Sequence, residues 1–314
     1  MTYRDRPEPA PKPYTFVDLP SDRIPRSAPI GHDMVHADRL TGRLQLQIEA
    51  LAPIHVASGL LRAVGAQPIA REFVRVDGVP VIPGSSFKGC IRAIVEAISA
   101  SCVRVTRTRD VPRELEGCRS QAWLCVACEL FGAQDYAGLV RFGDMRKTDD
   151  RDTEIVFTPQ LYRPRPDGGP YLRGRNVRGR KVYMHGTQQA RGDTPTEVCG
   201  VGSRFAGLVD FTNLTPAQLG LLLVALGCHE RYPLRPKLGG MKPACYGTIE
   251  VHLERLELIT PQQRFLAWSE PSGTSADPHD YLAAAAELML APQLADIVEA
   301  LRWPNERDCP GGVY

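Results

Sequence analysis

Alternating apolar and polar residues predict a set of β-strands along the chain. Residues 42–51 alternate strictly, as expected of a strand with one buried face. Residues 205–211 have a similar pattern. In residues 247–258 the alternation slips its phase before Leu256, which indicates a β-bulge.

A hairpin and a first helix are predicted between the first two of these strands. Residues 73–82 contain two short β-rich runs around Asp77-Gly78, a dipeptide typical of hairpin turns. Ser85 or Ser86 can cap the helix that follows, in which the apolar residues of positions 87–98 recur with a helical period.

Two more helical segments lie in the second half of the chain. The sequence Thr215-Pro216-Ala217-Gln218 combines an N-cap threonine, an early proline and a capping-box glutamine, and predicts a helix to about His229. The apolar residues of positions 280–303 also have a helical period, which predicts a C-terminal helical cap.

The order of these elements predicts an α+β fold. Without two insertions it is strand, hairpin, helix, then strand, helix, strand, which resembles the duplicated split βαβ unit of ferredoxin-like, RNA-recognition-like domains. The expected organisation is a proline-rich arm (1–40), a palm-like core (41–260) with a cysteine-rich zinc-binding insertion (101–130) and a basic, thumb-like hairpin insertion (145–200), and the helical cap (261–314).

Composition favours a globular cytoplasmic protein. Of the 314 residues, 43% are apolar and 24% charged, which argues against wholesale disorder. No run of 18 apolar residues could span a membrane, and the charged, proline-rich start lacks the apolar core of a secretion signal. In the cytoplasm, the nine cysteines are expected to be metal ligands or buried thiols rather than disulfides.

Four cysteines predict a metal site. Cys102, Cys118, Cys125 and Cys128 are separated by 15, 6 and 2 residues, and the last two form a CxxC knuckle. Four thiolates would make a closed structural zinc site with no open position for catalysis. Alternatively, Cys102 is merely buried and the metal takes three cysteines and another ligand. The remaining cysteines are expected to be core thiols: Cys90, Cys199, Cys228, Cys245 and Cys309.

The distribution of basic residues points towards nucleic acid. The net charge is only +2, but 32 of the 38 basic residues are arginine, which suits phosphate contacts and base stacking, although a GC-rich genome would also enrich it. Residues 162–181 contain seven basic residues and a single acid, Asp167. This composition predicts a loop or hairpin that faces nucleic acid, with a solvated loop as the alternative. The basic residues are Arg163, Arg165, Arg173, Arg175, Arg178, Arg180 and Lys181.

Two glycine-rich basic segments could bind phosphate. Residues 83–89 (PGSSFKG) begin the first predicted helix, where free N–H groups attract anions and Lys88 and Arg92 add charge. Residues 237–243 (KLGGMKP) lie between the second helix and the last strand. This second segment lacks Walker-loop spacing, which disfavours nucleotide hydrolysis.

Several short motifs, in order, resemble the RAMP superfamily, the repeat-associated subunits of CRISPR effectors. They are the arm PYTFVDLP, the helix start VIPGSSFKGCIR, the knuckle CVACELFG, the segment NVRGRKVYMH and the loop-and-strand LGGMKPACYGTIEV. The resemblance covers nearly all of residues 13–258 and is strongest to type III backbone subunits.

The resemblance implies a subunit that polymerises along CRISPR RNA and inserts a thumb into the guide–target duplex. Its implied partners are CRISPR RNA, target RNA, further copies of itself and other effector subunits, including a separate nuclease. By position, guide phosphates would be held by Ser85, Ser86, Lys88 and Arg92, with Lys237, Gly239, Gly240 and Lys242 on the opposite side of the groove. The thumb would present Arg175, Arg178, Arg180 and Lys181.

Catalysis by this chain is not expected. RNA-cleaving relatives use an aspartate in the loop after the first strand, but the corresponding residues 58–71 contain no acid. Cleavage of target RNA at regular intervals stays open as an alternative, with Asp77, Asp135 and Asp144 as weak candidates. A less favoured alternative, a CRISPR RNA-processing endonuclease, needs a His or Tyr base, and none of His32, His36, His55 and His185 stands out.

Overall fold

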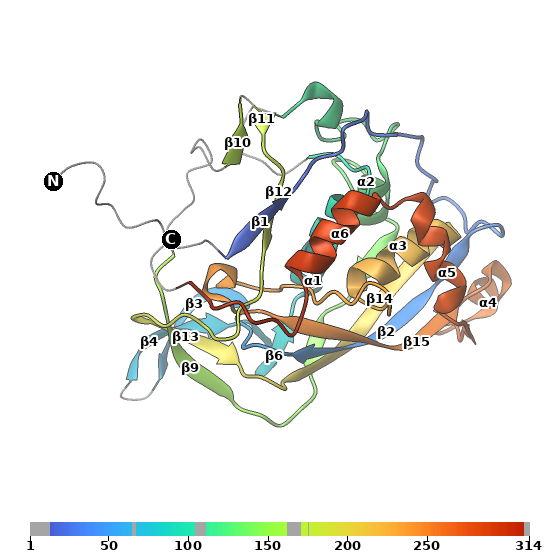
Figure 1. Ribbon diagram of the computed structural model, residues 1–314. Coiled ribbons are helices and arrows are strands. Elements are labelled where there is room, and N and C mark those ends of the chain that lie inside the picture. Colours follow the sequence, from blue (N-terminus) through green and yellow to red (C-terminus); the bar gives the residue numbers. More distant parts are fainter. Residues whose placement is uncertain (1–12, 65–66, 104–110, 162–170, 175, 311–314) are drawn as a thin grey trace.

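A large antiparallel sheet is the main unit of the protein. The computed structural model describes residues 13–64, 67–103, 111–161, 171–174 and 176–310. The sheet has the order β16–β15–β2–β14–β8–β6–β5, and β7 also pairs with β14 (Figure 1). Its strands are β2 (Leu40–Ala50), β5 (Arg75–Val76), β6 (Val79–Ile82), β7 (Val140–Phe142), β8 (Met145–Lys147), β14 (Arg204–Leu214), β15 (Ile249–Leu258) and β16 (Thr274–Ser275). The mixed α+β prediction is confirmed.

The central strands follow the sequence pattern. Leu44, Leu46 and Ile48 of β2 are buried on one face, and the residues between them are partly exposed. The pairing of β15 with β2 shifts between Leu253 and Arg255, which confirms the predicted bulge. The hairpin turn between β5 and β6 also forms where Asp77-Gly78 predicted it.

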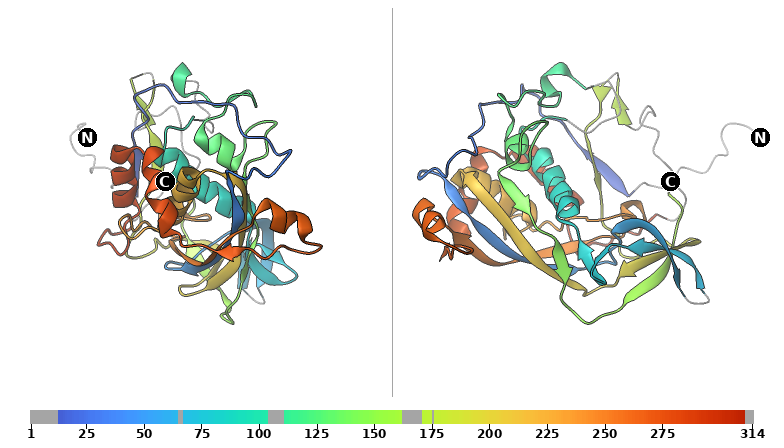
Figure 2. Two further views of the ribbon diagram at one scale, coloured as in Figure 1. Left: turned by 90° about the vertical axis from the view of Figure 1, so that its right-hand side faces the viewer. Right: turned by 180° about the vertical axis from the view of Figure 1, so that it is seen from behind.

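Helices cover one face of this sheet. Figures 1 and 2 show α1 (Gly84–Ile98), α3 (Pro216–Leu226) and α6 (Ala291–Ala300) gathered on that face, beside the short α2 (Val126–Phe131). Their apolar side chains share one core with β2 and β14. No helix in the described part of the chain is long and apolar enough to cross a membrane.

The sequence predicted the N-terminal cap of helix α3 correctly, but not that of helix α1. Thr215 forms the predicted capping box with Gln218, but α3 ends at Leu226, before His229, because Gly227 adopts a left-handed conformation with φ of 85°. The predicted serine cap of α1 is wrong, since the N-cap position is Pro83 and no side chain there accepts a hydrogen bond. Instead, the N–H of Gly84 donates to Asp144 Oδ1 at 2.8 Å, from the turn between β7 and β8.

A second, four-stranded sheet has the order β3–β4–β13–β9. It consists of β3 (Ala57–Val64), β4 (Gln67–Phe73), β9 (Thr153–Thr158) and β13 (Thr194–Cys199). The segment 58–71, expected to be a loop, therefore forms most of a β-hairpin. Two register shifts between β3 and β4 break the regular alternation on which a strand prediction depends.

The N-terminal arm is tied to the basic insertion. Strand β1 (Tyr14–Val17) pairs antiparallel with β12 (Arg180–Tyr183), so that Tyr14 lies opposite Tyr183. This small sheet, here called the arm sheet, lies next to α6 (Figure 1). Four residues of the predicted proline-rich arm therefore belong to a β-strand. A further short hairpin joins β10 (Leu172–Arg173) and β11 (Asn176–Val177).

The C-terminal segment is less regular than its helical pattern predicted. It contains α4 (Pro261–Leu266), α5 (His279–Leu282) and a 3₁₀ turn at Ala284–Glu287 before α6. Cys309, beyond α6, forms a disulfide with Cys245, which follows the Gly-rich segment. The prediction that these two cysteines are core thiols is therefore wrong. Cys90, Cys199 and Cys228 are free, the first two buried.

Candidate functional site

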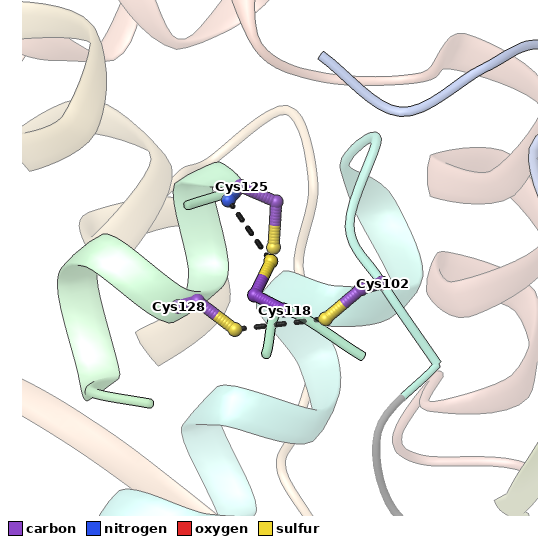
Figure 3. A group of neighbouring side chains, drawn as sticks. All are labelled: Cys102, Cys118, Cys125 and Cys128. Carbon is purple, nitrogen blue, oxygen red and sulfur yellow. Dashed lines mark hydrogen bonds between the residues drawn. The ribbon is translucent and has the colours of Figure 1, made fainter. Parts of the chain in front are cut away.

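Four cysteine side chains converge in the 101–130 insertion (Figure 3). Cys102 follows α1, Cys125 precedes α2, Cys128 lies within α2, and Cys118 comes from the intervening loop. All four are buried, and their sulfur atoms lie within 4.8 Å of one another. The grouping of all four thiols favours the set that includes Cys102 over the three-cysteine alternative.

This sulfur cluster has the donor chemistry of a metal site. Four thiolates so close together would repel one another unless a cation lay between them. The N–H of Cys125 donates to Cys118 Sγ at 3.3 Å, and Arg92 Nη2 lies 3.5 Å from Cys128 Sγ. Such contacts to sulfur orient ligands and spread their negative charge. The four cysteines therefore fit a tetrahedral metal ion.

Two arginines that were expected to bind RNA instead form hydrogen bonds to protein groups beside this cluster. Arg92 donates to Glu96 Oε1 at 2.7 Å and to the carbonyl oxygen of Gly132 at 2.8 Å. Arg180 donates to Glu96 Oε2 at 3.1 Å and to the carbonyl oxygens of Ser101 and Cys102. Burial lowers the pKa of Arg180. These guanidinium groups hold α1, β12 and the cysteine insertion together.

A cavity of about 810 Å³ lies between α1, the arm sheet and the Gly-rich segment. It collects residues that are far apart in sequence but were predicted to bind RNA: Ser86, Arg92, Arg180, Lys181, Lys237, Gly239, Gly240 and Lys242. Ser85, Lys88 and Arg178 are not among its lining residues, and Arg175 lies outside the described part of the chain. The cavity is the place where the glycine-rich and basic motifs meet.

Lys237 is the most unusual residue of the cavity. It is only 5% exposed, and its Nζ has no hydrogen-bond partner among the described residues. Burial, and then the neighbouring charge of Lys242, lower its pKa to about 7. The pKa of Lys88 is also lowered, by burial and by Arg92. An anion in the cavity would favour the charged form of Lys237.

The two glycines of the Gly-rich segment permit a close backbone approach. Gly239 has a φ of 80°, and a Cβ there would collide with the carbonyl oxygen of His55. The N–H of Gly240 donates to the same oxygen at 2.8 Å. A larger residue at position 239 would force the loop away from the end of β2 and change the cavity.

The arm sheet gives the cavity an aromatic wall that the sequence motifs did not reveal. Phe16, Tyr171 and Tyr183 line it, and Tyr171 is stacked on Tyr14 with 6.2 Å between ring centroids. Lys181 Nζ lies 4.0 Å from the centroid of Tyr14. The only sequence signal was the number of aromatics near the PYTF and GRKVY motifs, which becomes meaningful once their pairing is known.

Three of the four candidate histidine bases make hydrogen bonds to other protein groups. His55 is buried and its Nδ1 donates to the carbonyl oxygen of Glu197 at 2.7 Å, and burial lowers its pKa. His185 contacts Thr248 Oγ1 and the carbonyl oxygen of Arg235, and burial lowers its pKa to about 3. His32 Nε2 lies 2.7 Å from the carbonyl oxygen of Ala137 at the surface. The arrangement singles out no histidine as a nuclease base.

The candidate acids are also placed in local structure. Asp77 and Asp135 have positive φ values of 52° and 60°, respectively. Asp144 caps α1, as described above. Ser58 donates to Glu72 Oε2 at 3.0 Å, which joins the two strands of the β3–β4 hairpin.

Comparison with known proteins identifies the family. Residues 47–226, from within β2 to the end of α3, match the RAMP superfamily, and the chain belongs to this superfamily. No curated protein matches the chain. Membership indicates a CRISPR-associated RNA-binding protein. The arm, the Gly-rich segment and strand β15 lie outside the matched residues.

Proposed function

We propose that this chain is a backbone subunit of a type III-like CRISPR interference complex, which polymerises along CRISPR RNA and positions complementary target RNA. The observation that carries the proposal is the cavity, where Ser86 of α1, the glycines 239–240 and the cations Lys237 and Lys242 converge. Cations and side-chain hydroxyl groups of this kind hold phosphates without reading bases. Such binding suits a guide whose sequence varies.

The large sheet supports a ferredoxin-like palm. Strand β2, helix α1 and strands β7–β8 form one half, and β14, α3 and β15 form the other. The two leading strands, β2 and β14, are neighbours at the centre, with β15 and β8 outside them. This is the arrangement expected of a duplicated split βαβ unit with both helices on one face.

The cysteine cluster is proposed to hold structural zinc. Cys102, Cys118, Cys125 and Cys128 would be the ligands, and the ion would cross-link α2 to the end of α1. A four-thiolate site leaves no position for water or substrate, so its contribution is stability and not chemistry.

Binding without cleavage is the favoured activity. The β3–β4 hairpin occupies the position where cleaving relatives carry an aspartate, and residues 58–71 contain none. Arg62 and Arg71 in this hairpin can hold a phosphate but cannot act as bases at neutral pH. Target cleavage is therefore assigned to another subunit of the complex.

Contacts with further copies of the chain are proposed for the second sheet. Leu60, Leu61 and Ile69 of its hairpin are 66%, 70% and 61% exposed. Exposed apolar side chains of this kind can take part in protein contacts. The basic insertion, with Arg178 and Lys181 near the arm sheet, remains the proposed thumb region for target capture.

The proposal is tested by isolating RNA with the protein. The chain would be purified from cells that carry a CRISPR array and its other effector subunits, and the bound RNA would be sized and sequenced. Guide-length RNA that begins in the repeat is the expected result. A preparation that contains no array-derived RNA contradicts the proposal.

A further inference from the structure

The cavity has two chemically different walls. On one side lie Ser86, Lys237 and Lys242, from α1 and the Gly-rich segment. On the other side lie Phe16 and Tyr171, from the arm sheet and the segment beside it. A volume of about 810 Å³ falls within the range of small-molecule sites, about 300–1,000 Å³.

The basic wall calls for an anion. A buried ammonium without a hydrogen-bond partner is costly, because the charge has lost its water without gaining another contact. Lys237 is in this position: its Nζ has no partner among the described residues, and the nearby charge of Lys242 disfavours it further. At Gly89 of α1, a Cβ would meet no atom within 4 Å, so the helix leaves space beside this wall. A phosphate group held at this wall by Ser86 and Lys242 would also offset the charge of the buried Lys237, which interacts electrostatically with Lys242.

The aromatic wall suits a planar, uncharged group. The Phe16 and Tyr171 rings meet edge to face with their centroids 5.9 Å apart, which fixes their orientation. Aromatic rings are the usual surface on which proteins stack nucleobases without regard to sequence.

We propose that this cavity is a nucleotide pocket, which holds one nucleotide of the bound RNA with its phosphate at Lys242, where it also offsets the charge of Lys237, and its base against Phe16 and Tyr171. The inference rests on the proposed RNA-binding function and adds a base-binding wall to it. Only a ligand that has both a phosphate and a base would contact the basic wall and the aromatic wall together. The arm sheet therefore contributes directly to RNA binding.

The test compares two oligonucleotides on the full chain. One is a fluorescently labelled RNA octamer, and the other is an octamer of the same ribose-phosphate backbone without bases. Phe16→Leu and Tyr171→Leu should each weaken binding of the RNA about tenfold, as expected for loss of base stacking. The same variants should bind the baseless octamer as the unchanged chain does. Phe265→Leu, in the 89%-exposed position of α4, is the matched control and should change neither affinity.

The variant Lys242→Ala distinguishes a failure of this inference from a failure of the proposed RNA-binding function. This variant should weaken binding of both octamers equally, because it acts on phosphate. If Lys242→Ala has that effect while Phe16→Leu and Tyr171→Leu bind RNA normally, the base-binding wall is wrong and the proposed function stands. If the unchanged chain binds neither octamer, both fail. Phe16→Trp, which keeps an aromatic face, should retain RNA affinity and guards against a folding defect in Phe16→Leu.

A free nucleotide has the same chemistry as one residue of RNA. Adenosine 5′-monophosphate is therefore used as a competitor of the labelled octamer. Displacement only at concentrations well above those of unlabelled octamer supports an RNA residue as the ligand. Displacement by the mononucleotide at lower concentration than the octamer would assign the pocket to a free nucleotide and overturn the inference.

Discussion

Arg180 Nη1 of strand β12 lies 3.1 Å from Glu96 Oε2 of helix α1, and both side chains are nearly buried, with 13% and 12% exposure. Glu96 also pairs with Arg92 at 2.7 Å. One carboxylate thus neutralises two guanidinium groups, and joins the arm sheet to the helix that bears the cavity.

Glu96→Gln should therefore destabilise the fold strongly. Removal of the shared carboxylate leaves two buried cations without their partner, which costs about 3 kcal/mol of the free energy of unfolding. Urea denaturation measures this value. Glu299→Gln, which weakens the more exposed pairs of Glu299 with Arg302 and Arg307, is the control and should cost less than about 1 kcal/mol. Similar losses for both variants would contradict the assigned role of Glu96.

Metal analysis of the purified chain should find one zinc ion per molecule. The four buried thiols of the cluster leave room for one tetrahedral ion, and binding of that ion contributes to folding. A strong chelator should lower the melting temperature by several degrees. Cys125→Ser should lose zinc and solubility, whereas Cys228→Ser, outside the cluster, should keep both. A stable protein without metal would rule out this site.

Phosphate binding should not depend on RNA sequence. Lys88→Ala and Lys242→Ala should each weaken RNA binding equally for unrelated sequences and reduce the slope of log affinity against log salt by about 1. Arg264→Ala in α4 serves as the control. Filter binding at several salt concentrations gives the slopes. A loss confined to particular sequences would indicate base readout instead of phosphate contact. Arg92→Ala, in contrast, should act mainly on stability.

Lys237 should make RNA binding depend on pH. Its pKa in the free protein is about 7, below the ordinary 10.5, and a bound phosphate would raise it. Binding then takes up a proton above pH 7, so affinity should fall by up to about fivefold between pH 7 and pH 8. Lys237→Met should abolish this dependence. Lys242 and His185 both lie near enough to Lys237 to interact with its charge. The pKa of His185 is about 3, so His185 stays neutral over this pH range.

The same lysine should affect stability in the opposite sense. Because its folded pKa is depressed, the unfolded chain binds more protons between pH 7 and pH 10.5, and stability rises with pH across that interval. Comparison of the unchanged chain with Lys237→Met by urea denaturation at pH 7 and pH 9 isolates this contribution. A stability difference between the two that does not vary with pH would contradict the depressed pKa.

The chain should not cut target RNA. A guide-loaded complex, free of other nucleases, should bind matched target in the presence of magnesium and leave it intact on a denaturing gel. Regularly spaced cuts that vanish in Asp77→Ala or Asp135→Ala would overturn the proposal. Asp144→Ala is less informative for cleavage, because this residue caps α1 and the variant should also lose about 1 kcal/mol of stability.

Sequence reasoning was most successful where a signal is local. The alternation of β2, the Asp77-Gly78 turn and the Thr215 capping box each depend on residues within a few positions, and each is present. The spacing of the four cysteines likewise predicted correctly that their thiols lie close together.

Features that depend on distant partners were missed. The cap of α1 is Asp144, sixty positions from Gly84, so no local pattern could identify it. Arg180 looked available for RNA because its partner Glu96 comes close only after β12 packs near α1. The Arg92–Glu96 pair, in contrast, is four positions apart within α1 and could have been predicted from the sequence. The same holds for the Cys245–Cys309 disulfide, whose cysteines are 64 residues apart.

The pairing of β1 with β12 also sets an order of events during synthesis. Tyr14 leaves the ribosome early, whereas its partner Tyr183 is translated about 170 residues later. At about 5–20 residues per second, the arm waits on the order of ten to thirty seconds. Until then the aromatic wall has only one of its strands, so a nascent chain cannot assemble the complete cavity. In the proposed function, capture of guide RNA at this wall would therefore follow translation of the basic insertion.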